Sequence, residues 1–172
     1  MTENVCAWDL EGPLSWVDFA AALFPMMEKK LKKKNLDQFF EMISNYDDFL
    51  IDYPNEAKKI GVLDYQPGDT LRLLAPFYVN YFTDQELKDI SKSNPGLLPG
   101  INTVMDYLKK NWDIYIISTS YTQHAYNIAN LLNIPIDKVY CTTLNVEELK
   151  AELTDFDEYV KIKPGKAAVK KA

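Results

Sequence analysis

The spacing of apolar residues changes near Asn94-Pro95-Gly96, and this change limits the possible folds more than any other feature. Between residues 15 and 93, apolar and aromatic side chains recur at helical spacing, without convincing strand patterns. Beyond the break the sequence predicts, in order, a helix from about 101 to 108, a strand over 113–117, a helix over about 121–132 and a strand over 139–142. Such alternation predicts a parallel sheet with right-handed crossovers.

One more strand is expected before the helical segment. Residues 4–8 form a short apolar run that ends at Asp9, and Gly12-Pro13 marks a turn after it. Ser15 is expected to cap the first helix, and Thr83 with Glu86 matches the capping-box pattern of a later one. We therefore expect an α/β core formed by residues 1–14 and 95–172, with a helical domain, residues 15–94, inserted after the first strand.

Composition excludes several classes of protein. The net charge is −6 and only one of the 19 basic residues is arginine, which argues against a nucleic-acid-binding protein. No apolar run approaches the roughly 18 residues of a membrane span, and no signal peptide is expected. Cys6 and Cys141 lie in apolar, strand-like runs, so free thiols in a reducing compartment are expected, which favours a cytoplasmic location.

Two carboxylates follow the first strand. Asp9 lies at its C-terminal end, where parallel α/β sheets bind ligands, and Glu11 is two residues further on the same side of an extended segment. Two carboxylates so placed can divide the work between nucleophile and general acid/base. The alternative at this point is a strand that merely ends in a polar turn.

A run of hydroxyl side chains follows the second strand. Ser118 and Thr119 come directly after Ile114-Tyr115-Ile116-Ile117 and precede a helix, so they can bind phosphate oxygens near free helix N–H groups. The alternative is that they only cap the helix. His124, the only histidine, is expected near the mouth of the site without a role in catalysis.

Together these segments resemble the haloacid dehalogenase superfamily. Asp9-Leu10-Glu11-Gly12 is similar to its first motif, and Leu98-Pro99-Gly100-Ile101 followed by a helix and Ile-Tyr-Ile-Ile-Ser118 is similar to its second. The helical insert resembles the family's cap domain. Glu in place of the usual Asp at position 11 is similar to the phosphoserine phosphatase, phosphoserine/homoserine phosphotransferase and enolase-phosphatase branches.

The resemblance implies a Mg²⁺-dependent phosphohydrolase acting on a small phosphorylated metabolite. Asp9 would form an aspartyl phosphate, Glu11 would be the acid/base, and Asp9 with the Glu11 backbone carbonyl would hold Mg²⁺. Ser118, Thr119 and a lysine would bind the phosphoryl group; Lys163 is preferred over Lys161 and Lys166. A phosphotransferase and a catalytically impaired binding or assembly subunit are the alternatives, and homo-oligomerisation is left open.

The family's fourth, acidic motif is not found in the sequence. We therefore expect the C-terminal part of the core to be missing and the native chain to continue past Ala172. Otherwise the metal ligands should come from the late acidic cluster, Asp155, Asp157 and Glu158.

Overall fold

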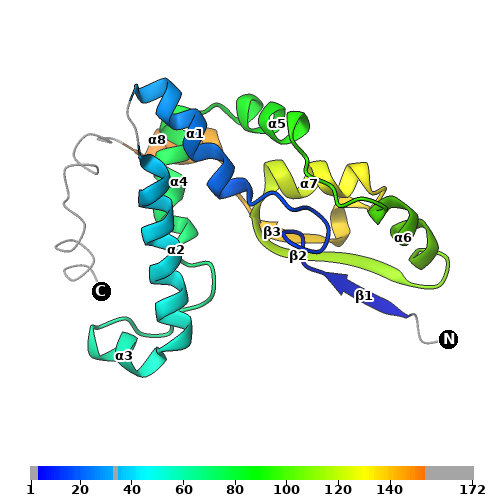
Figure 1. Cartoon of the computed structure of the whole chain (residues 1–172), viewed down its shortest axis with the longest axis horizontal. Helices are drawn as coiled ribbons and strands as arrows, with labels where there is room; N and C mark the ends of the chain where they lie inside the picture. The colour runs from blue at the N-terminus through cyan, green and yellow to red at the C-terminus, as the bar shows by residue number, and fades with distance from the viewer. Residues whose placement is uncertain (1–3, 33–34, 154–172) are drawn as a thin grey trace. The chain divides into compact units, whose positions relative to one another are not determined.

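The computed structural model describes residues 4–32 and 35–153 (Figure 1). Its elements are, in chain order, β1 (Val5–Trp8), α1 (Phe19–Leu31), α2 (Leu36–Asp52), α3 (Pro54–Lys59), α4 (Leu71–Tyr81), α5 (Asp84–Ser93), α6 (Ile101–Leu108), β2 (Asp113–Tyr121), α7 (Thr122–Leu131), the 3-10 helix η1 (Ile136–Lys138), β3 (Val139–Thr142) and α8 (Val146–Glu152). Among these described residues, no helix combines the length and apolar character needed to cross a membrane.

The chain forms two compact units. One contains residues 1–23 and 82–145, and the other contains residues 24–81 and 146–172. The first unit holds a three-stranded sheet in the order β1-β2-β3, with both neighbouring pairs parallel. This confirms the predicted α/β class and the predicted parallel sheet.

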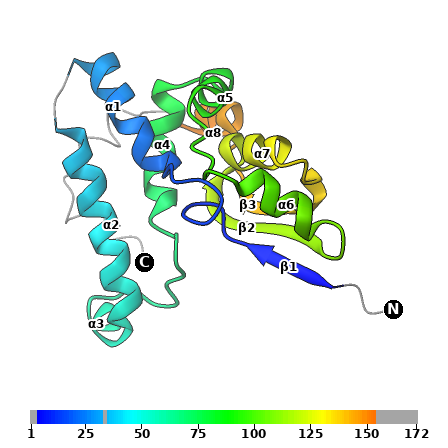
Figure 2. The same cartoon turned by 45° about the vertical axis from the view of Figure 1, so that its right-hand side comes forward.

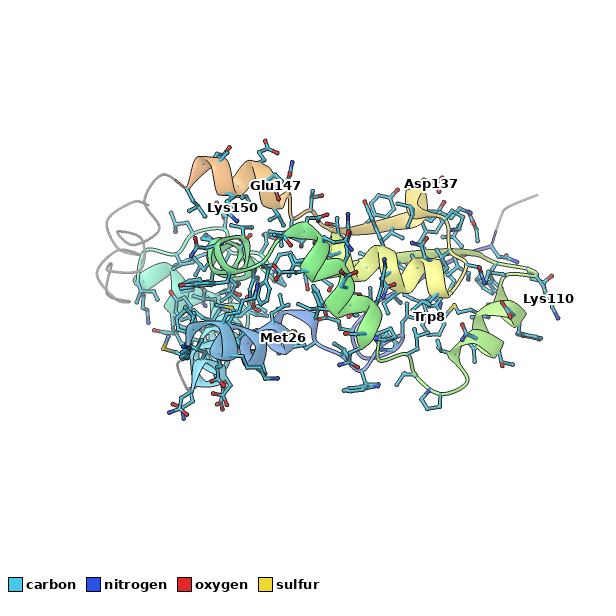
Figure 3. All side chains as sticks on the ribbon, turned by 90° about the horizontal axis from the view of Figure 1, so that it is seen from above. Trp8, Met26, Lys110, Asp137, Glu147 and Lys150 are labelled. Atoms are coloured by element: carbon cyan, nitrogen blue, oxygen red, sulfur yellow. The ribbon has the colours of Figure 1, made fainter. Side chains whose placement is uncertain are left out.

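One face of this sheet is covered by α6 and α7, as Figures 1 and 2 show. Alternate strand residues, among them Ile114, Ile116 and Val139, turn toward these helices and join a core with Met105 and Ile128. Trp8, labelled in Figure 3, packs against the same core from the end of β1.

Residues of the opposite strand faces are exposed. Val5 and Ile117 are each 56% exposed and Tyr140 is 60% exposed. The two-residue period of a strand explains this division, because successive side chains point to opposite faces.

The turn after β1 brings the chain back toward Pro95. Gly12 has φ +104°, a conformation that a side chain disfavours, and its N–H donates to the Ser15 carbonyl at 2.7 Å. The prediction that Ser15 caps the first helix is wrong, because its buried hydroxyl donates to the Pro95 carbonyl at 2.8 Å. Helix α1 begins later, and Asp18 accepts the Ala21 N–H at 2.9 Å in the capping position.

Helix α5 belongs to the sheet unit. Its capping box is present, as predicted: the Thr83 hydroxyl accepts the Glu86 N–H, and the Glu86 carboxylate accepts the Thr83 N–H at 2.8 Å. Helix α5 packs on α7, side by side with it in Figures 1 and 2. Buried Ser91 of α5 contacts His124 of α7, which helps explain why α5 groups with the sheet.

The second unit is helical in its described part. An aromatic cluster joins its helices, with Phe24 contacting Phe39, Phe40 and Tyr78 at ring-centroid distances of 5.3–6.3 Å. Pro76 lies inside α4. Helix α8 packs on α4, so this short C-terminal helix joins the helical unit rather than the sheet.

Candidate functional site

Asp9 lies where β1 ends. The parallel register pairs Trp8 with Ile116, so Asp9, just after β1, and Ser118, within β2, belong to neighbouring strands at the same edge of the sheet. The Asp9 side chain is exposed, and its Oδ1 accepts the N–H of Leu10 at 2.7 Å. A fixed, solvent-facing carboxylate at the carboxyl edge of a parallel sheet is in the position where this class of sheet binds ligands.

The Glu11 side chain extends from the turn after β1 to the first residue of α1. Its Oε1 accepts the N–H of Phe19 at 3.1 Å, one of the N–H groups that the helix cannot satisfy by itself. The Phe19 N–H therefore restrains the Glu11 side chain.

The surroundings of Glu11 favour its protonated form. Burial raises its pKa to about 6, and the negative charges of Asp18 and Asp9 contribute in the same direction. The Phe19 N–H and the Ser120 hydroxyl oppose this rise by favouring the charged form. A carboxyl group with a pKa of about 6 can both give and accept a proton near neutral pH.

The hydroxyl run lies within β2 and not after it. The prediction that the strand ends before Ser118 is wrong, because β2 continues to Tyr121, which pairs with Thr142 after an irregularity in register. Ser118 is half-buried and its Oγ accepts the Ser120 N–H at 3.1 Å, while Thr119 is exposed.

Ser120 is a further residue of this site that the sequence analysis did not select. Its side chain is 5% exposed, and its Oγ makes no well-formed hydrogen bond among the described residues, although it lies close enough to Glu11 to influence its pKa. The only signal in the sequence was its place in the Ser-Thr-Ser run.

Two sets of predicted residues lie outside the described part of the chain. These are Lys163 with its alternatives Lys161 and Lys166, and the acidic residues Asp155, Asp157 and Glu158. Within residues 4–32 and 35–153, no three His, Cys, Asp or Glu side chains gather to hold a metal ion.

His124 is fully buried and does not lie at a site mouth. Burial lowers its pKa to about 4, so the ring is neutral at pH 7. Its Nδ1 is 2.9 Å from the Ser91 hydroxyl, and its ring stacks on Phe19 with centroids 4.9 Å apart.

Comparison with solved structures identifies the fold. A gene product of Archaeoglobus fulgidus is similar over 96% of this chain and 51% of its own, with 24% identity and a TM-score of 0.69. A phosphoserine phosphohydrolase-like protein of Francisella tularensis is similar over 81% of this chain and 58% of its own, with 21% identity and a TM-score of 0.54. The α/β fold of this chain is the fold of these two structures. DsGPDH of Dunaliella salina is similar over 82% of this chain and 21% of its own, with 17% identity and a TM-score of 0.50.

The chain spans about half the length of these first two structures. No family model and no curated protein sequence matches it. The likeness at these identities concerns the fold alone, and any chemistry depends on Asp9, Glu11 and their neighbours.

Proposed function

We propose that this chain carries the nucleophile and the acid/base of a phosphohydrolase that acts on a small phosphomonoester. The observation that carries the proposal is the pair at the end of β1: Asp9 is exposed, and Glu11, two residues on, is held by the Phe19 N–H with a pKa of about 6. The exposed Asp9 carboxylate is the proposed nucleophile toward phosphorus, and Glu11 is the proposed proton donor and acceptor. The structural likeness to a phosphoserine phosphohydrolase-like protein supports the same substrate class.

The proposed reaction has two steps. In the first, an oxygen of Asp9 forms a bond to phosphorus as the bond to the ester oxygen breaks, and Glu11 gives its proton to the departing alcohol. In the second, Glu11 takes a proton from water, the water oxygen bonds to phosphorus, and the Asp9 carboxylate and inorganic phosphate are released. Ser118 and Thr119, beside Asp9 on β2, are proposed to bind phosphoryl oxygens, with Lys163 as the proposed cationic partner.

Magnesium is the proposed cofactor. The Asp9 carboxylate and the Glu11 carbonyl are hard oxygen donors, and Mg²⁺ in proteins commonly takes one or two carboxylates together with substrate phosphate and water. When bound, the ion would offset the negative charge of phosphate and carboxylates. One Asp9 oxygen already accepts the Leu10 N–H, which fixes the carboxylate plane before any ligand arrives.

The experiment is a screen of phosphomonoesters with Mg²⁺, using wild type and Asp9→Asn. Asn keeps the shape and loses the nucleophilic charge, so turnover should fall by at least about 10³-fold. Asp106→Asn, an exposed carboxylate on α6, is the matched control and should retain activity. Near-wild-type turnover in Asp9→Asn would overturn the proposal.

The product of the reaction separates the alternatives. Release of inorganic phosphate supports a hydrolase, whereas transfer to an added alcohol identifies a phosphotransferase. Binding of a phosphomonoester without turnover, equal in wild type and Asp9→Asn, would support a binding subunit.

A further inference from the structure

The donor that holds Glu11 is itself fixed by a buried side chain. Phe19 supplies the N–H that Glu11 accepts, and the Phe19 ring is 1% exposed and stacked on His124 with an interplanar angle of 4°. Ring and N–H belong to one residue at the first turn of α1. Holding the ring therefore restrains the direction of the N–H bond.

His124 has few groups that could hold its ring in place. Its Nδ1 meets the Ser91 hydroxyl at 2.9 Å, and its Nε2 is buried without a hydrogen-bond partner among the described residues. Ser91 is also buried and accepts the amide N–H of Asn127 at 2.9 Å. The Ser91 hydroxyl thus joins the Asn127 amide to the His124 ring.

These contacts form one continuous series. It runs from Asn127 on α7 to Ser91 on α5, back to His124 on α7, across the stacked rings to Phe19, and through the Phe19 N–H to Glu11. Leaving Nε2 of a fully buried histidine without a partner costs free energy, which a phenylalanine or leucine at this position would avoid. A residue kept at such a cost is a candidate for a role beyond packing.

We propose that His124 is a positioning residue for Glu11, acting through the stacked ring and the backbone N–H of Phe19. The inference rests on the proposed function, in which Glu11 moves the protons. It does not place His124 in contact with substrate. The orientation of the Glu11 carboxylate depends on the imidazole being held by Ser91.

The first test measures the contact without relying on activity. Hydrogen exchange at the Phe19 amide, followed by NMR, should accelerate at least about 10-fold in His124→Leu, because the donor loses its restraint. The Ala21 amide, which Asp18 accepts at 2.9 Å, is the internal control and should change less than about 2-fold. An unchanged Phe19 rate, or equal acceleration of both amides, overturns the proposal.

The second test measures the consequence for Glu11. His124→Leu should lower kcat about 10- to 100-fold with little change in KM, and should add almost nothing in a Glu11→Gln background. Additive losses would show that His124 acts elsewhere and would overturn the proposal. Met105→Leu, a buried substitution of similar volume in the same unit, should leave kcat within about 2-fold of wild type.

Two further measurements keep the outcomes distinct. If His124→Leu does not fold, Ser91→Ala takes its place, because it removes the hydroxyl that orients the ring and should produce the same pattern. If wild type shows no phosphohydrolase activity, the proposed function fails, and the exchange rates of the Phe19 amide still decide whether His124 positions the donor of Glu11.

Discussion

Replacing Glu11 by Gln should stabilise the folded protein at neutral pH. The amide oxygen can still accept the Phe19 N–H, so the start of α1 keeps its hydrogen bond. The substitution removes a negative charge that is half-buried and lies near the charges of Asp18 and Asp9. The charged form of Glu11 is thus disfavoured in the folded state, and Gln avoids that cost.

The size of this effect follows from the pKa of Glu11. A rise from 4.5 to about 6 corresponds to about 2 kcal/mol of free energy of unfolding. Because the folded-state pKa is raised, the stabilising contribution of protonated Glu11 is fully present below pH 4.5 and is lost as the pH rises through about 6. The advantage of Glu11→Gln over wild type should therefore grow by up to about 2 kcal/mol between pH 4.5 and pH 7.5.

The assay is urea unfolding of both proteins across this pH range in EDTA, so that bound divalent ions do not contribute. Subtracting wild type from variant cancels every other titrating group that the two proteins share. Glu28→Gln is the matched control, because Glu28 accepts the Leu36 N–H at 2.8 Å, also eight residues along the chain at the start of a helix.

Two results would contradict the reasoning. The first is a difference between Glu11→Gln and wild type that stays constant with pH, since that would mean Glu11 has an ordinary pKa. The second is the same pH trend in Glu28→Gln, since that would attribute the effect to any carboxylate at a helix start.

Three other perturbations test the packing around the site. Gly96→Ala should lower the free energy of unfolding in urea by about 1–3 kcal/mol, because φ is +60° and a Cβ would collide with the Val17 side chain. Gly61→Ala should cost less, because Gly61 has φ +87° but open space around it. Gln123→Leu should cost about 2–4 kcal/mol by the same assay, because its buried amide binds a backbone carbonyl after β3 and a carboxylate at the start of α5. Lowering the pH from 6.5 toward 4 should remove up to about 3 kcal/mol through protonation of His124 in the unfolded chain, a loss that His124→Leu should not show in acid urea titrations.

Hydrophobic periodicity was sufficient to predict the sheet. The strands 4–8 and 139–142 and their parallel order follow from short apolar runs separated by helical ones, and the structure has them at Val5–Trp8 and Val139–Thr142. The extension of β2 through Ser118 was not predictable in this way. The strand extends past the three hydroxyl residues because Tyr121, beyond an irregularity in register, pairs with Thr142 of β3, and no local pattern predicts that pair.

Predictions from local sequence patterns were wrong where a side chain contacts a residue far away in the chain. Ser15 has the residue type of a helix cap, but its hydroxyl donates to a carbonyl 80 residues away, and Asp18 caps the helix instead. His124 was expected near the mouth of the site because its helix follows the hydroxyl run. Its burial depends on Ser91 and Phe19, which no local pattern connects to it.

The most direct test of the account is the covalent state of Asp9 during turnover. Acid quenching of the wild-type protein with substrate and Mg²⁺, followed by peptide mass spectrometry, should find one phosphoryl group on Asp9. The Glu11→Gln variant should accumulate more of this species if water activation is slowed more than attack. Turnover without a phosphoryl group on Asp9, or with one on another residue, would contradict the central claim.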